Sequence, residues 1–382
     1  MVPIRIRLYE CYLLGMLILS RLLTITFRRK HDIWLIAERG EDARDNGYHL
    51  FKYMKNHHPN ISVKYLIKAD SPDRKKLAFA SSDVINYGSF LHFIYLWRAN
   101  YLISTHSMGY ANHSLFLTLN NKFNIFGKRK RVFLQHGITK DDLPMLYYKN
   151  LKIDMFCTGA YPEYKFIKER FGYPEGVVKY TGFCRYDNLN RFVKKKQILI
   201  MPTWRKYINK NKFEESVFYT QYSNLLSNSN FVALLEKYGF KAIFYPHYEF
   251  QPLISSFKKL ALSPLIEIAD FNYDVQQLLK ESAMLITDYS SVYFDMAYMS
   301  KPIIYFQFDN DEFRAKHYKR GYFREESLGT VTYDLEALLS ELSKILCCGC
   351  KMKEEHLKYS NYFFKYRDSM NCERVYNSIT SL

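Results

Sequence analysis

The apolar positions of this 382-residue chain cluster into short runs, and most runs are followed by a polar loop and then by a stretch with helical spacing. Short unbroken apolar runs are typical of strands that are buried on both faces. Strands that alternate with helices predict a parallel sheet with helices on both sides. The predicted strands are Ile33 to Ala37, Val63 to Ile67, Tyr101 to Ser104, Val132 to Leu134, Asp154 to Cys157, Val178 to Tyr180, Ile198 to Met201, Ala242 to Tyr245, Met284 to Thr287 and Ile303 to Phe306.

This alternation restarts after a basic stretch, Lys194 to Lys196, and the chain is long enough for two domains of ordinary size. We therefore predict an α/β protein with a domain boundary near that stretch. The expected segments are residues 1–30 as an amphipathic membrane-associating segment, 31–195 as the N-terminal domain, 196–350 as the C-terminal domain, and 351–382 as helices that pack back across the domains.

The segment Leu8 to Phe27 is apolar over a length that would suffice to span a bilayer, but it contains Glu10 and Arg21. Basic residues flank it on both sides, which favours a helix lying in the interface of an anionic leaflet. A transmembrane anchor and a helix packed on the protein's own surface stay open as alternatives. A signal peptide is disfavoured, because no small-residue cleavage site follows the apolar core.

The stretch from Ala283 to Phe306 predicts a strand, a polar loop, a helix and a second strand. In such a unit a ligand sits beyond the carboxyl end of the first strand, over the amino end of the helix. Backbone N–H groups and the positive end of the helix dipole face that position, so it suits an anion. Ser290 and Ser291 add hydroxyl donors at the helix start, and we expect a phosphate to bind there.

Three other predicted strands end in side chains that can take part in chemistry. His136 follows a strand of the first domain, whereas Arg205 and His247 follow two strands of the second. Each residue alone has an ordinary structural explanation, as a satisfied polar side chain or a surface ion pair. Because functional groups of parallel sheets gather at the carboxyl edge, their common position predicts a site, which we place in a cleft between the domains.

Composition narrows the class of partner. Lys and Arg outnumber Asp and Glu by 55 to 38, a net charge of +17, which favours anionic partners such as phosphorylated substrates, anionic lipid or nucleic acid. The seven cysteines have neither disulfide-framework nor zinc-finger spacing. Glycine-rich dinucleotide motifs, a Walker loop and kinase motifs are absent, and no aromatic RNA-binding signature appears.

Five ordered motifs then carry a family resemblance: LQHGITKDD, TGFCRYDNL, ILIMPTWR, YPH and ITDYSSVYFDMAYMSKPIIYF. Together they resemble the CDP-glycerol glycerophosphotransferase family, the TagB- and TagF-like enzymes of teichoic acid and capsule assembly. The similarity extends from about Ile33 onward. It implies a GT-B architecture, meaning two Rossmann-like domains facing across a cleft. It also implies a bacterial enzyme attached peripherally at the cytoplasmic face of the cell membrane.

The resemblance also implies roles for the strand-end residues. His136 would be the general base that takes the proton of an acceptor hydroxyl, and Arg205 would hold the donor pyrophosphate. His247 would stabilise charge on the leaving CMP. The remaining donor-site candidates are Asp288, Ser290, Ser291 and Asp295.

The implied reaction transfers glycerol phosphate, or a related alditol phosphate, from CDP-glycerol or another CDP-alditol to a lipid-linked glycan acceptor. We expect no obligatory cofactor or metal, because the helix dipole and cationic side chains can neutralise a pyrophosphate. We also expect no nucleic-acid partner, because no aromatic RNA-binding signature is present. The first alternative is a GT-B glycosyltransferase that uses a nucleotide sugar. The second is a non-catalytic binder of nucleic acid or anionic lipid.

Overall fold

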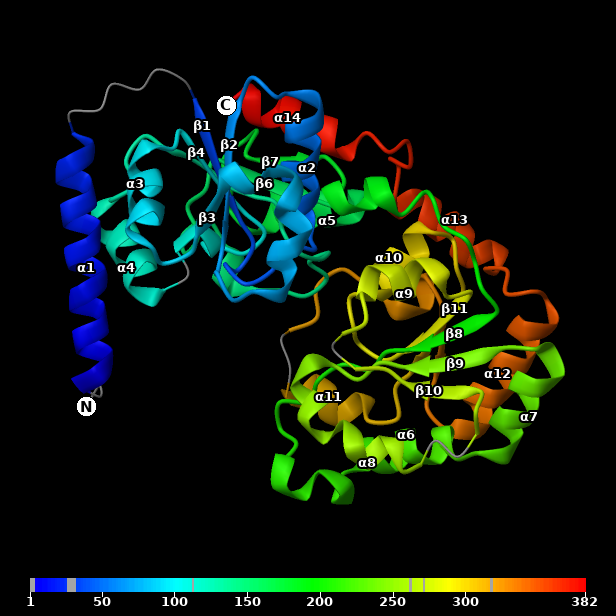
Figure 1. Ribbon diagram of the computed structural model, residues 1–382. Helices are drawn as coiled ribbons and strands as arrows, with labels where there is room; N and C mark the ends of the chain where they lie inside the picture. The colour runs from blue at the N-terminus through cyan, green and yellow to red at the C-terminus, as the bar shows by residue number, and fades with distance from the viewer. Residues whose placement is uncertain (1–3, 26–31, 112, 261–262, 271, 317–318) are drawn as a thin grey trace. The chain divides into compact units, whose positions relative to one another are not determined.

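The structure is a computed structural model that describes residues 4–25, 32–111, 113–260, 263–270, 272–316 and 319–382. The chain forms two compact units, each built around its own sheet (Figure 1). Unit 1 holds the described residues up to Ile138, together with Leu143–Asp187 and Asp368–Leu382. Unit 2 holds Thr139–Asp142 and Asn188–Arg367.

The sheet of unit 1 has seven strands in the order β3-β2-β1-β4-β5-β6-β7, and all pairs are parallel. The strands are β1 (Ile33–Ala37), β2 (Ser62–Ile67), β3 (Val84–Asn86), β4 (Tyr101–Ser104), β5 (Lys130–Phe133), β6 (Met155–Thr158) and β7 (Val178–Tyr180). The α-helices are α1 (Ile4–Thr24), α2 (Asn46–His57), α3 (Phe90–Arg98), α4 (Ser114–Phe123), α5 (Tyr161–Arg170) and α14 (Asn371–Thr380). Short 3-10 segments are Pro72–Asp83, Gly109–Ala111, Pro144–Leu146 and Cys184–Asn188.

The sheet of unit 2 has six parallel strands in the order β10-β9-β8-β11-β12-β13. They are β8 (Gln197–Ile200), β9 (Lys241–Phe244), β10 (Ile266–Ile268), β11 (Met284–Thr287), β12 (Ile303–Phe306) and β13 (Thr330–Thr332). The α-helices are α6 (Val217–Leu226), α7 (Ser229–Tyr238), α8 (Ile254–Lys258), α9 (Val275–Glu281), α10 (Tyr293–Tyr298), α11 (Asn310–Lys316), α12 (Leu335–Cys347) and α13 (Glu354–Phe363). The 3-10 segments are Lys210–Glu215, Tyr248–Leu253 and Glu325–Ser327.

Burial on both faces of each sheet explains why the sequences of the strands are apolar at consecutive positions. Every residue of β1 is buried. Its Trp34 and Ile36 side chains pack into one hydrophobic cluster, while Leu35 and Ala37 pack into a second. Because successive side chains point to opposite faces of a strand, these are the cores on the two sides of one sheet. The prediction of two α/β domains with parallel sheets is confirmed.

Each sheet has a point where the strand order reverses. In unit 1 it lies between β1 and β4, and in unit 2 between β8 and β11. Loops that leave adjacent strands at such a point run in opposite directions, and the crevice between them is the usual ligand position in open α/β sheets.

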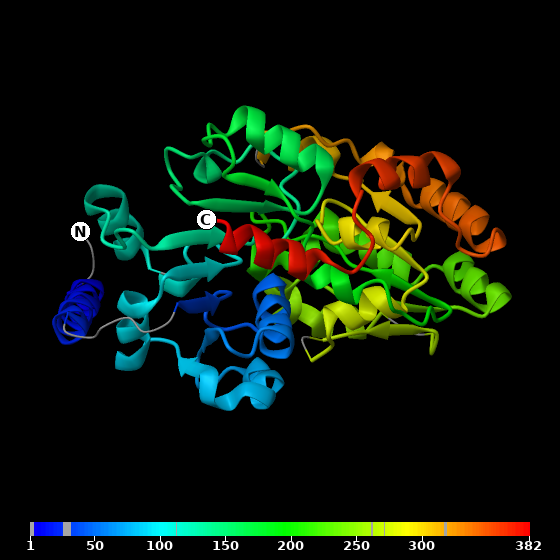
Figure 2. The same cartoon turned by 90° about the horizontal axis from the view of Figure 1, so that it is seen from above.

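The C-terminal residues are divided between the units. Helix α14 lies next to α2 in both views (Figure 1 and Figure 2) and adds Cys372, Val375 and Ile379 to a core cluster of unit 1. Helix α13 contacts α10 of unit 2. Unit 1 ends at Asp187 in the first pass of the chain, a little before the expected boundary at residue 195.

Helix α1 runs alongside α3 in unit 1 (Figure 1). Leu13 and Leu17 are buried against α3, and the Trp97 indole N–H donates to the Leu17 carbonyl (3.0 Å) and to Ser20 Oγ (3.1 Å). The opposite side of the helix leaves large apolar side chains exposed, among them Ile18, Leu19, Leu22 and Leu23. None of the helices in the described residues has an apolar stretch that would cross a bilayer.

Candidate functional site

The sequence-predicted residues of unit 2 follow three neighbouring strands. Arg205 follows β8, His247 follows β9, and Asp288 to Ser291 follow β11. Since β9, β8 and β11 are adjacent in the parallel sheet, these loops meet at one carboxyl edge, and the β8 and β11 loops flank the reversal point.

Arg205 is fully buried at the centre of an ion network. Its guanidinium contacts Asp288 (Nη1 to Oδ2, 2.9 Å) and both carboxylate oxygens of Asp309 (Nε 2.7 Å, Nη2 3.0 Å). Nη1 also donates to the Thr203 carbonyl at 2.8 Å. Burial alone would lower the pKa of Arg205, but the two carboxylates more than offset it and the pKa is raised. Arg205 is therefore a permanent cation.

Aromatic rings enclose the same guanidinium. Its central carbon lies 5.3 Å from the Phe218 ring centroid, 4.9 Å from that of Tyr289 and 5.0 Å from that of Phe313. Each nitrogen thus bonds within the protein, and flat rings surround the group. These contacts support the loop after β11, and direct contact of Arg205 with a pyrophosphate stays a prediction.

Asp288 organises the loop after β11. Its buried carboxylate accepts hydrogen bonds from the backbone N–H groups of Thr203 (2.8 Å) and Tyr289 (2.5 Å) and from the Tyr222 hydroxyl (3.3 Å). The side chain of Gln307 donates to the Asp288 carbonyl at 3.0 Å. The hydrogen bonds of Asp288 therefore connect the β8 and β11 loops. They fit a role in orienting the loop better than a role in proton transfer.

Ser290 and Ser291 form the turn into α10. Ser291 is exposed and Ser290 half-buried, whereas every residue of α10 itself is buried. The carbonyls of the two serines accept the N–H groups of Tyr293 and Phe294 at the helix start. Ser291 is thus accessible at the amino end of a buried helix turn, where an anion is favoured. Asp295 lies within α10 and is buried.

Lys140 is a residue that the sequence reasoning missed. It belongs to unit 2, and its Nζ donates to the carbonyl of Tyr289, next to Ser290, at 2.7 Å. Burial lowers the pKa of Lys140, and the positive charge of Arg314 lowers it further, whereas the negative charges of Asp141 and Glu325 raise it. An amine in such a setting gains from a nearby anion. The signal in the sequence is its place in the motif LQHGITKDD, four residues after His136.

His247 begins the 3-10 segment after β9. Its Nδ1 accepts the N–H of Glu249 at 3.3 Å, so the neutral ring carries its proton on Nε2. Burial lowers the pKa of His247, while the charges of Glu249 and Asp288 oppose the shift. A neutral ring with Nε2–H is a hydrogen-bond donor at neutral pH.

His136 of unit 1 follows β5 in a strained turn. The preceding Gln135 has φ +58°, a left-handed conformation that is costly for a residue with a side chain. Asn46 stabilises the turn by donating its amide to the Gln135 carbonyl at 2.6 Å. The His136 ring keeps contact with solvent, although surrounding atoms desolvate it and lower its pKa. Strain that is held in place around an accessible imidazole is typical of a functional site.

A second histidine, also missed in the sequence, lies against His136. The rings of His106 and His136 stack with centroids 4.6 Å apart and planes 4° apart. Burial, together with His136 and Arg39, lowers the pKa of His106 to about 3, so it stays neutral. A hydrogen bond to the Thr105 carbonyl supports the His136 ring. A ring nitrogen that donates to a carbonyl leaves the other nitrogen of the neutral ring as an acceptor, as a general base requires.

No cluster of three or more His, Cys, Asp or Glu side chains that could hold a metal ion occurs among the residues that the structure describes. The donors at the unit 2 edge are cationic or neutral, and its carboxylates Asp288 and Asp309 are bonded to Arg205.

Comparison with protein families decides the assignment. Residues 18–381 match the model of the CDP-glycerol:poly(glycerophosphate) glycerophosphotransferase family. The chain belongs to this family. The resemblance seen in the five motifs is confirmed.

Two curated relatives show how far the similarity extends. The minor teichoic acid biosynthesis protein GgaB of Bacillus subtilis (strain 168) is 33% identical over 375 residues, which cover 93% of this chain and 40% of GgaB. The teichoic acid poly(ribitol-phosphate) polymerase of Bacillus spizizenii (strain W23) is 24% identical over 369 residues, covering 88% of this chain and 54% of the polymerase. The chain therefore spans about half of these relatives or less.

Among solved structures, the wall teichoic acid polymerase TagF superposes with a TM-score of 0.67 at 16% identity, over 98% of this chain and 95% of that one. This likeness shows a shared fold.

Proposed function

We propose that this glycerophosphotransferase-family chain transfers glycerol phosphate, or a related alditol phosphate, from CDP-glycerol or another CDP-alditol to a hydroxyl of a membrane-linked glycan. CMP is the second product, and the biological setting is teichoic acid or capsular polysaccharide synthesis in a bacterium.

The observation that carries the proposal is the loop after β11. Ser290 and Ser291 offer hydroxyl and N–H donors at the reversal point of a parallel sheet, and Lys140 lies beneath the same loop. Donors of this kind suit the pyrophosphate of a nucleotide donor.

The transfer itself needs one proton acceptor and stabilisation of the departing phosphate. The acceptor hydroxyl gives its proton to the unprotonated nitrogen of His136, and its oxygen forms a bond to the β-phosphorus of the donor. The bond from that phosphorus to the bridging oxygen breaks, and CMP leaves with the electron pair. Phosphoryl transfer of this type depends on alignment and charge stabilisation more than on covalent catalysis.

The residues of unit 2 serve the leaving group. His247 donates from Nε2 to the pyrophosphate, and the Ser290–Ser291 turn binds its oxygens. Arg205 and Asp288 hold that turn in place. Asp295, which lies in the helix behind it, is assigned to the support of the donor site. No obligatory metal or other cofactor takes part.

We extend the proposal to the arrangement and location of the enzyme. The two units are the two Rossmann-like halves of a GT-B enzyme, and turnover brings His136 to the donor bound by unit 2. Helix α1 lies in the cytoplasmic leaflet as a peripheral anchor, which is supported by its exposed Ile18, Leu19, Leu22 and Leu23 and by the net charge of +17.

The direct test measures CMP release by the purified chain from CDP-glycerol and CDP-ribitol, with a lipid-linked glycan acceptor. UDP-sugars are assayed in parallel. We expect CMP release that requires the acceptor and persists in a chelator. The Ser290→Ala/Ser291→Ala double variant should raise KM for the donor about tenfold, while Ser227→Ala, an exposed serine of the same unit, should leave it unchanged.

Release of UDP from a nucleotide sugar, with no CMP from any CDP-alditol, would replace the proposal with a glycosyltransferase. Complete loss of activity in a chelator that is reversed by a divalent cation would contradict metal-independent transfer.

A further inference from the structure

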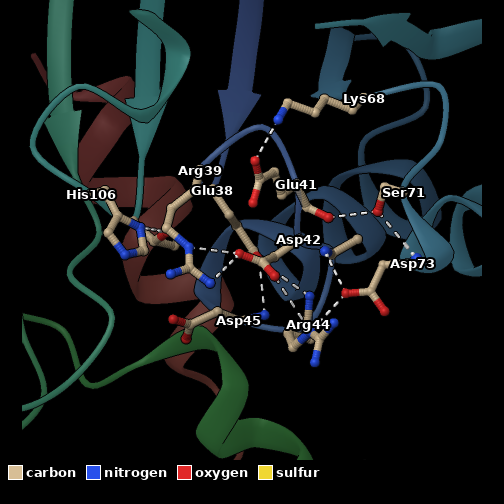
Figure 3. Close-up of polar contacts among 12 residues, drawn as sticks. Glu38, Arg39, Glu41, Asp42, Arg44, Asp45, Lys68, Ser71, Asp73 and His106 are labelled. Carbon is tan, nitrogen blue, oxygen red and sulfur yellow. Dashed lines mark hydrogen bonds and ion pairs between the residues drawn. The ribbon is translucent and has the colours of Figure 1, made fainter. Parts of the chain in front are cut away.

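The amino end of α2 in unit 1 is arranged in the same way as a nucleotide-binding turn. The position that a phosphate would take there is filled by a side chain of the protein. Glu38 leaves β1 at the reversal point, and its carboxyl group accepts the N–H groups of Arg44 (3.2 Å), Asp45 (2.8 Å) and Tyr48 (3.0 Å). Figure 3 shows the Glu38 side chain pointing into this turn. A phosphate would bind such N–H groups in a dinucleotide-binding fold, so Glu38 occupies the anion position.

Glu38 is enclosed, and its place is fixed. Only 1% of its surface is exposed, and a Cβ added at Gly109 would lie 1.6 Å from its carbonyl oxygen. Glycine at that position therefore lets the loop after β4 pack directly on the end of β1. Burial and the charge of Asp45 raise the pKa of Glu38 to about 8.

The turn that Glu38 holds is connected to the His136 turn by four contacts. Asn46, at the start of α2, donates to the Gln135 carbonyl at 2.6 Å and accepts the N–H of Arg185 at 3.1 Å. Arg185 Nη1 in turn contacts Asp45 Oδ1 (3.2 Å) and the His136 carbonyl (3.0 Å). A buried acid, a helix start and the strained histidine turn thus form one continuous network.

The charged groups around the His136 ring have opposing effects. Desolvation lowers its pKa most, Asp45 and the bond to the Thr105 carbonyl raise it, and Arg185 and Arg39 lower it. The stacked His106 ring stays neutral. Asp45 is the carboxylate among these groups, and Arg185 Nη1 links it to the His136 carbonyl by bonding to both.

We propose that Asp45 is a positioning residue of the transfer reaction: its carboxylate, held by the Glu38-filled turn, stabilises the imidazolium that forms when His136 takes the acceptor proton. Arg185 keeps Asp45 in place and moderates its charge. This inference deepens the proposed function and rests on the role given there to His136.

The test compares two variants with opposite expected signs. Asp45→Asn removes the charge but keeps a good helix N-cap, because Asn and Asp cap equally well. Arg185→Gln removes the neighbouring cation. We expect the pKa of His136 to fall by about one unit in the first variant and to rise in the second. Asp70→Asn, which removes an exposed carboxylate of the same unit, is the matched control and should leave it nearly unchanged.

Two measurements on the full chain separate this inference from the function on which it rests. NMR titration of labelled histidine, assigned with His136→Asn, reports the pKa without any substrate. The pH profile of kcat/KM for CMP release reports the same group in the reaction, and its acidic limb should move with the NMR value.

Opposite shifts in both measurements support the proposal. An NMR pKa that Asp45→Asn leaves unchanged overturns it, whatever the rates. NMR shifts that the kcat/KM profile does not follow also overturn it, because Asp45 then acts on a histidine that is not the base. A wild-type chain without CMP release refutes the proposed function instead, and the NMR titration still decides whether Asp45 acts on His136.

Discussion

Replacing Arg205 with Met tests whether this residue supports the donor loop from inside the protein. The side chain is fully buried and contacts both Asp288 and Asp309. Met fills a similar volume between the rings of Phe218 and Tyr289 but leaves two buried carboxylates without their cation. Removing one partner of a buried ion pair typically costs about 3–5 kcal/mol. Since a unit of this size loses about 2–4 °C of Tm per kcal/mol, we expect the Tm of unit 2 to fall by about 6–20 °C.

The assay is calorimetry of the full chain, with the Arg205→Met/Asp309→Asn double variant as the rescue. Neutralising Asp309 removes one of the two uncompensated charges, so the double variant should regain about 1–3 kcal/mol relative to the single variant. Arg191→Met is the matched control, because Arg191 is an exposed arginine of the same unit. Its Tm should change by less than about 2 °C.

The opposite pattern would refute this reasoning. If Arg205→Met keeps the wild-type Tm while KM for CDP-glycerol rises strongly, the guanidinium binds the donor directly and the buried network opens during catalysis. A second contrary outcome is that Asp309→Asn alone lowers the Tm as much as the double variant does. In that case the attraction between Arg205 and the carboxylates does not stabilise unit 2, and the packing of the aromatic rings accounts for the effect.

Three further predictions follow from other parts of the structure. Lys140→Met should raise donor KM about tenfold, because the amine lies beneath the donor loop, whereas Lys212→Met at an exposed position should not. Leu19→Glu should weaken cosedimentation with anionic vesicles, while Val193→Glu, an equally apolar exposed position in unit 2, should not; equal binding of all three proteins would contradict the anchor. Burial lowers the pKa of His92 to about 4, so the unfolded chain binds a proton there between pH 6.5 and 4 that the folded chain does not. Unfolding should therefore become easier by about 3 kcal/mol as pH falls through that window, and His92→Gln should remove this loss in urea titrations.

The strands and the two-domain plan could be predicted because a strand that is buried on both faces is apolar at consecutive positions, which a short stretch of sequence shows. The run Ile33–Ala37 is apolar at consecutive positions since its side chains enter two different cores. The order of the strands in each sheet has no comparable pattern in the local sequence. That β8 lies at the centre of its sheet, between β9 and β11, depends on which face each connecting helix covers, and no short window of sequence encodes this.

The candidate site was predictable only where position in the chain and position in the sheet coincide. His247 and Ser290 directly follow strands, so the carboxyl-edge rule locates them. Arg205 obeys the same rule, but its environment depends on Asp309, 104 residues further along the chain in the loop after β12. His106 also ends a strand, and only the adjacency of β4 and β5 brings it against His136.

The two reversal points of this chain explain how one folding plan can supply different chemistry in each unit. In unit 2, Arg205 and Asp288 neutralise each other beside the loop after β11, and Ser291 of the Ser290–Ser291 turn is exposed; the proposed function has an anion bind at this turn. In unit 1, Glu38 satisfies the equivalent donors at the start of α2. An incoming phosphate would have to displace a buried acid there, which costs several kcal/mol. The start of α2 therefore bonds to Glu38, and its Asn46 supports the His136 turn through the Gln135 carbonyl.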